Sequence, residues 1–163
     1  AGSALSGNDN TDADPEILVA IGELSTSIGA ADITEVEMVT TTADKSEGFT
    51  ISVRVRYNEP VDVVTTGGTP TLAVTNDNSG TGSGRGPHTL SYASGTGTNE
   101  LIFSLAIAAA NAATNADDVL SVGAQTIALN SGTIKDASGT ASDAALVISG
   151  AVGTAAGTVT VTA

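Results

Sequence analysis

The sequence predicts an all-β antiparallel sandwich, and three observations lead to that prediction. From Phe49 to Tyr57, apolar residues alternate strictly with polar ones, which is the period of a half-buried strand. About seven or eight short segments of this kind follow at roughly ten-residue spacing. Turns rich in glycine separate them, and no segment of the sandwich region shows a helical period.

The chain divides into an N-terminal arm or extension, residues 1–32, and a sandwich, residues 33–163. The first fifteen residues are polar and acidic, so we expect them to be flexible or ordered by a partner. The run from Ile17 to Ile21 is apolar but too short for an independent helix, and we interpret it as a strand. The sandwich then begins with a strand near Ile33–Met38 that has one polar side.

The next elements follow from alternation and turn chemistry. After Phe49–Tyr57, the residues Asn58–Asp62 predict a corner that ends the strand, and Gly67–Pro70 predict a second turn. Asn76–Gly86 predicts a long glycine-rich hairpin tip and Ser94–Gly97 a tight turn. The remaining strands are expected at Val61–Val64, Thr71–Thr75, Thr89–Ala93, Glu100–Ile107, Ala124–Leu129, Ala145–Ile148 and Thr158–Val161.

The predicted core takes the inward-facing side chains of these strands. It is built mostly from small and β-branched residues, because only four of the 163 residues are aromatic. Its members are Phe49, Ile51, Val53, Val55, Tyr57, Leu72, Val74, Leu90, Tyr92, Leu101, Phe103, Leu105, Leu129 and Leu146.

Charge and composition exclude several classes of partner and site. A net charge of −13 repels phosphate backbones and anionic lipids, so we expect neither nucleic acid nor a membrane surface as a partner. The absence of cysteine excludes disulfides and thiolate metal sites. No run approaches the ~20 apolar residues of a membrane-spanning helix.

Four motifs in order resemble bacterial immunoglobulin-like modules of large surface adhesins, cyanobacterial swimming-motility surface proteins and phage virion proteins. They are Tyr57–Val63, Gly68–Val74, Tyr92–Ser104 and Leu129–Gly139, and the resemblance covers roughly residues 33 to 150. It implies an immunoglobulin-like antiparallel β-sandwich with a structural or adhesive role. The sequence departs from the usual pattern after Ile107, where an alanine-rich piece stands in place of an acidic turn, and this weakens any transfer of a metal site.

Few residues suggest a catalytic, phosphate-binding or metal-binding site. His88 is the only histidine, and without a nucleophile elbow we expect it to be a solvated loop residue rather than a general base. The glycine-rich Ser79–Gly86 lacks the Lys-Ser/Thr of a phosphate-binding loop. The densest carboxylate cluster, Asp9, Asp12 and Asp14, offers hard oxygen ligands for calcium but lacks the glycine and distal glutamate of an EF-hand loop. We therefore expect no catalytic residue and no cofactor, with calcium as a weaker alternative to simple solvation.

Two function classes remain, both non-enzymatic. The first is a phage virion component, either a capsid decoration protein or a tail-associated subunit. The second is a subunit of a bacterial adhesin or extracellular filament at the cell surface. Virion is preferred because adhesins usually string many modules together, whereas a single sandwich becomes multivalent on a repeating lattice. A carbohydrate-binding sandwich ranks last, because it would need exposed aromatic residues.

The arm yields a prediction about assembly. Ile17, Leu18, Val19 and Ile21 would form an exposed hydrophobic strand if left in water, so we expect them to pair with a sheet edge. A neighbouring subunit is the preferred partner in a homo-oligomer or lattice, and the chain's own domain is the alternative. Deleting residues 1–22 should leave a folded monomer that no longer assembles, as measured by light scattering and circular dichroism. An unfolded product would assign the strand to its own core.

Overall fold

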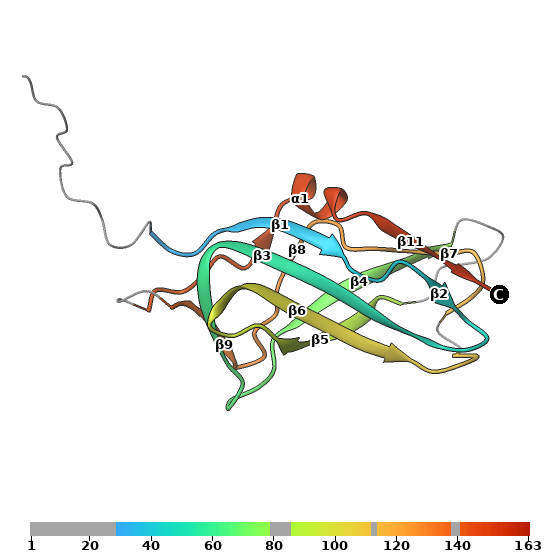
Figure 1. Ribbon diagram of the computed structural model, residues 1–163, viewed down its shortest axis with the longest axis horizontal. Coiled ribbons are helices and arrows are strands. Elements are labelled where there is room, and N and C mark those ends of the chain that lie inside the picture. Colours follow the sequence, from blue (N-terminus) through green and yellow to red (C-terminus); the bar gives the residue numbers. More distant parts are fainter. Residues whose placement is uncertain (1–28, 79–85, 112–113, 138–140) are drawn as a thin grey trace, which may run out of the picture.

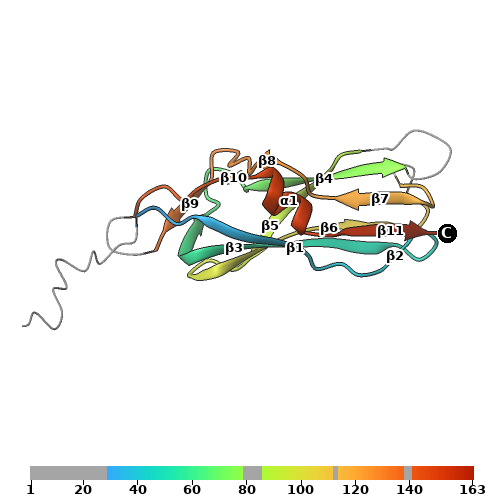
Figure 2. The same cartoon turned by 90° about the horizontal axis from the view of Figure 1, so that it is seen from above.

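The fold is a sandwich made by curling one large antiparallel sheet into two layers. The computed structural model describes residues 29–78, 86–111, 114–137 and 141–163. Figures 1 and 2 show the elongated sandwich, with the C-terminus at the end opposite the start of β1. The elements are β1 (Ile33–Met38), β2 (Ala43–Asp44), β3 (Phe49–Val64), β4 (Thr71–Asn78), β5 (His88–Ser94), β6 (Thr98–Ile107), β7 (Asp118–Ser121), β8 (Gln125–Thr126), β9 (Thr133–Asp136), β10 (Val147–Ile148), α1 (Gly150–Ala155) and β11 (Thr158–Thr162).

The strand order explains how one sheet forms two layers. The hydrogen-bonded path runs β1-β3-β6-β5-β4-β7-β11-β2, and β9 joins the end of β3. The first four strands form one layer, and β4, β7, β11 and β2 form the other. Figure 2 shows β4 and β7 along one side of the molecule and β1 and β3 along the other. The sheet therefore ends at β1 and β2, which follow each other in the chain but lie in different layers.

Strand β3 confirms the alternating pattern but overturns the predicted corner. Ile51, Val53, Val55 and Tyr57 are buried, as their spacing requires. The strand does not end at Asn58–Asp62; it continues to Val64, with a register shift between Arg56 and Val61. A bulge accommodates Pro60 without ending the strand, because the missing N–H is tolerated where ladder pairing is interrupted. Beyond the bulge β3 pairs with β9.

The middle of the chain follows its turn signals. The β5–β6 turn falls at Ser94–Gly97, where Gly95 has φ +117° and a Cβ would lie 2.0 Å from the Glu100 carbonyl oxygen. Glycine is therefore required there. The connection at Gly67–Pro70 carries the chain from β3 to β4. The predicted hairpin tip lies partly outside the described residues. At its base, Thr71–Val74 of β4 pair with His88–Ser91 of β5.

The last third of the chain departs most from the strands that the sequence predicts. The predicted strand at Ala124–Leu129 is only the two-residue β8, and Ala145–Ile148 reduces to β10. Strands β7 and β9 were not predicted, because each has only four residues and their partners are distant in sequence. Helix α1 was also missed. Its signals were present: Ser149 caps the N-terminus by accepting a hydrogen bond from the Val152 N–H, and Gly157 follows the end with φ +84°.

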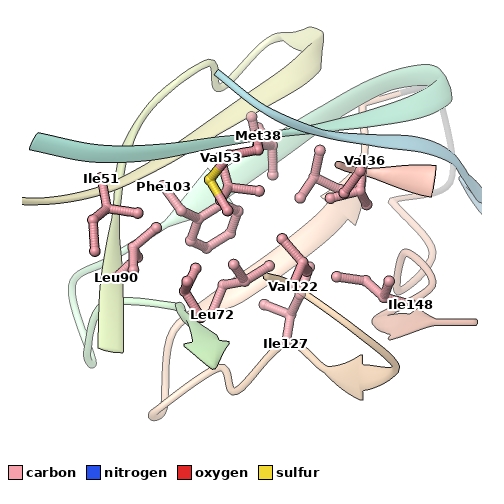
Figure 3. Packing of buried hydrophobic residues seen from close by; sticks show 14 of the residues in the cluster. Val36, Met38, Ile51, Val53, Leu72, Leu90, Phe103, Val122, Ile127 and Ile148 are labelled. Atoms are coloured by element: carbon pink, nitrogen blue, oxygen red, sulfur yellow. The ribbon is translucent and has the colours of Figure 1, made fainter. Parts of the chain in front are cut away.

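The core between the layers contains the predicted residues, nine of them fully buried. Figure 3 shows the Phe103 ring in the middle, with Val53 and Met38 on one side and Leu72 on the other. Tyr92 meets Phe103 edge to face, with 6.1 Å between ring centroids. The five others, Phe49, Tyr92, Leu105, Leu129 and Leu146, are partly buried against this cluster. The prediction also omitted buried residues, most of them from β1 and from the poorly predicted last third. Among these are Val36, Met38, Leu120, Val122, Ile127, Ile134 and Ile148, and Val61 and Ile107 of β3 and β6 were omitted as well.

The register of β3 can be tested with one substitution at two positions. Val53→Asp places a charge among fully buried side chains and should lower the free energy of unfolding by about 4 kcal/mol. Val64→Asp, on the same strand but half exposed, should cost about 1 kcal/mol or less. Thermal or urea unfolding measures both. Equal effects would mean that the register is wrong.

Candidate functional site: the free edge of strand β1

Strand β1 has one paired side and one open side. Its pairing with β3 is antiparallel and includes Val36 opposite Val55. At its end, the Val39 N–H donates to the Ser52 oxygen of β3 at 2.9 Å, whereas the Met38 N–H donates to the Ala156 oxygen on the other side. Backbone groups alternate along a strand, so the N–H and C=O of Val36 point the same way as those of Met38, away from β3. They face an edge to which no other described strand is paired.

A groove runs between this edge and helix α1. It has a volume of about 390 Å³ and is lined by β1 residues 34–37 and by Ala151, Val152 and Ala155. Figures 1 and 2 show α1 beside β1, at the open side of the sandwich between the layers. Ala151 and Ala155 are one helical turn apart, so they lie on one face of α1. Their small side chains leave room next to the strand.

Backbone hydrogen bonds occupy the free edge at both ends of β1. At the start of β1, the Ala145 N–H donates to the Ala31 oxygen at 2.8 Å. At its end, the Met38 N–H donates to Ala156. Residues 32–37 lie between these two bonds, a length of about 20 Å in an extended strand. The free edge is therefore a short window.

Charged side chains cover the outer face beside the groove. Glu37 forms an ion pair with Arg54, and Glu35 pairs with Arg56 at 2.8 Å. Arg56 also contacts Glu100 at 2.5 Å, and this hydrogen bond lowers the pKa of Glu100 below its ordinary value. The glutamates on the rim are thus largely neutralised by neighbouring strands. These groups are half exposed, so the pairs contribute little to stability.

An open edge beside a partly apolar groove can accept an extended peptide as an added strand. Main-chain hydrogen bonds would give affinity, and the groove would take alternate side chains. Charge on the edge and a covering helix also limit unspecific edge-to-edge pairing. A short strand of suitable sequence therefore fits this edge and groove better than the edge of an unrelated sheet would.

The predicted partner-binding residues Ile17, Leu18, Val19 and Ile21 lie outside the described residues. The same holds for the calcium candidates Asp9, Asp12 and Asp14. Neither prediction is tested by the structure. Within the described ranges, no group of three His, Cys, Asp or Glu side chains is arranged to hold a metal ion.

The prediction of a solvated His88 is wrong. His88 is the first residue of β5 and is buried, with its Nε2 atom 3.2 Å from Asn76 Nδ2 and 3.4 Å from Thr114 Oγ1. Burial lowers its pKa, and the negative charge of Asp118 opposes that shift. Asp118 accepts a hydrogen bond from the Asn115 N–H at 2.7 Å. The cluster joins β4, β5 and the start of β7 inside the sandwich.

A second buried carboxyl lies at the bulge of β3. Glu59 is 8% exposed, and its Oε1 atom has no hydrogen-bond partner among the described residues. Burial raises the pKa of Glu59, and the negative charges of Asp136 and Asp32 raise it further. Sequence alone gave no signal for this group, because the predicted corner would have exposed it to solvent.

Comparison of the chain with known protein families, curated proteins and solved structures gave no significant match. In the part of the chain that the structure describes, no helix is long and apolar enough to cross a membrane. The site must therefore be interpreted from its own geometry.

The Glu59 carboxyl gives a prediction about pH. Because its pKa is raised in the folded state, the folded protein holds this proton more tightly than the unfolded chain does. Its contribution to stability then falls as pH rises above the ordinary glutamate value of about 4.3. Glu59→Gln should raise the melting temperature relative to wild type at pH 7, and the difference should vanish near the ordinary glutamate pKa. Exposed Glu47→Gln is the matched control and should change little at either pH. An equal difference for Glu59→Gln at both pH values would contradict the prediction.

Proposed function

We propose that this chain is a non-enzymatic structural subunit of a repeating assembly, most simply a virion component that decorates a capsid or associates with a tail. The observation that carries the proposal is the free edge of β1 beside its groove. An edge of this kind offers backbone hydrogen bonds to a neighbouring protein. The net charge of −13 favours protein neighbours over nucleic acid or anionic lipid.

We also infer that the sandwich is immunoglobulin-like. The layer β1-β3-β6-β5 has the order of the A, B, E and D strands of such domains, and β4-β7-β11 has the order of C, F and G. This order supports the resemblance to modules of bacterial adhesins and phage virion proteins. The segment from β8 to α1 is an addition between the strands that correspond to F and G, and it forms one wall of the groove.

A virion and a bacterial surface filament both suit such a subunit. The described residues form one sandwich with one groove of this kind at β1, and a single weak site becomes an effective attachment when a lattice presents many copies. A capsid exterior repeats the same position many times, so we place the virion first. A subunit of a cell-surface adhesin or filament is the alternative.

Purified particles test the location. Mass spectrometry of phage particles should find this protein at high copy number, and electron cryomicroscopy should find it regularly arranged on the outside. Antibody labelling of intact particles provides an independent measurement of exposure. Recovery of the protein in fibres sheared from uninfected cells, and not in particles, would overturn the virion proposal in favour of the surface filament.

A further inference from the structure

We propose that the β1 groove binds the apolar segment Ile17–Ile21 of a second copy of this chain as an added strand. The inference rests on the proposed function as an assembly subunit and names the partner of its docking edge. The groove belongs to the described sandwich, and the segment has an apolar sequence that we expect to pair with a sheet edge. Its consequence is a homo-oligomer in which each arm occupies a neighbour's edge.

The length of the segment fits the window. Five extended residues span about 16 Å, and the free part of the edge, residues 32–37, spans about 20 Å. The hydrogen bonds at Ala31 and Met38 close the window at both ends, so a much longer strand could not pair in register. Pro15 and Gly22 flank the segment and would end such a strand at either side.

The chemistry of the segment also fits. An extended Ile17–Ile21 presents Ile17, Val19 and Ile21 on one side, where they can fill the space between β1 and the small residues of α1. Its backbone can pair with the outward N–H and C=O of Val36. Burial of two or three such side chains removes an exposed apolar strand from water.

The geometry favours a second copy over the chain's own arm. The arm joins the sandwich at Gly29, directly before Ala31, and the outer side of Ala31 is already occupied by Ala145. An arm returning along its own edge would have to reverse within residues 22–28 and pass around that segment. The same seven residues can extend about 23 Å away from the sandwich, which brings Ile17–Ile21 within reach of a neighbour.

The charges near the site predict how salt acts. Glu16 and Glu23 flank the segment, and Glu35 and Glu37 lie on the rim of the groove. Arg54 and Arg56 neutralise part of the rim, but the remaining repulsion opposes docking. Salt screens exposed charges, so higher ionic strength should strengthen the oligomer.

Disulfide trapping in the full-length chain tests the inference, because the protein has no cysteine of its own. One copy carries Val19→Cys and a differently sized tagged copy carries Ala151→Cys, on the groove face of α1. Docking raises the local thiol concentration from about ten micromolar to about millimolar, so the mixed disulfide should form on the order of a hundredfold faster than with a control. The control is Thr154→Cys, also exposed on α1 but lining a different hollow. Val19→Asp should abolish the oligomer in light scattering with the melting temperature unchanged.

Three results would overturn the inference. The first is a mixed disulfide that forms no faster at Ala151→Cys than at Thr154→Cys. The second is a disulfide that forms only within one chain in the double variant Val19→Cys, Ala151→Cys, which would assign the groove to the chain's own arm. The third is an oligomer that stays intact in Val19→Asp. Each result can occur while the protein is still found on particles, so it would remove the inference and not the proposed function. Trapping at the groove without recovery from particles would remove the virion proposal alone.

Discussion

Strand β3 is the element on which the rest of the sandwich depends. It pairs with β6 from Phe49 to Arg56, with β1 on its other side, and with β9 beyond the bulge. Because side chains alternate along a strand, its register decides which residues of these neighbours face the core. Val36 and Met38 of β1 and Leu101 and Phe103 of β6 are buried only in the observed register. A slip by one residue would turn each set outward.

The bulge in β3 links this framework to the far end of the sandwich. Up to Arg56 the strand lies between β1 and β6, and from Val61 it pairs with β9. The Pro60 carbonyl accepts a hydrogen bond from the Ala137 N–H, so the strand stays connected where Pro60 has no N–H to give. The bend also buries Glu59 beside Asp136, which ties local geometry to a raised pKa. The loss of stability that Glu59 causes as pH rises therefore originates at an irregularity rather than in the regular sheet.

The open edge of β1 follows from the same arrangement. The sheet curls until its two ends, β1 and β2, belong to different layers, and β2 instead pairs in parallel with β11. The chain from β10 through α1 then fills the side of the sandwich next to β1 without adding a strand to it. Ala145 and Ala156 take the backbone groups at the two ends, and the middle of the edge stays available. An unpaired strand edge thus remains, among the described residues, where the curled sheet stops.

The sequence by itself determined the all-β class, the strands β1, β3, β4, β5, β6 and β11, the turn at Ser94–Gly97 and the part of the core that β3, β4, β5 and β6 supply. These depend on period-two alternation and glycine-specific turns, which act between residues close in the chain. Only the tertiary structure decided the continuation of β3 through Asn58–Asp62, the burial of His88 against Asn76 and Thr114, and the groove between β1 and α1. Each requires contacts between residues distant in sequence; β1 and α1 are more than a hundred residues apart. Local pattern places a side chain on a face of a strand, but it does not specify which distant element will cover that face or leave its edge open.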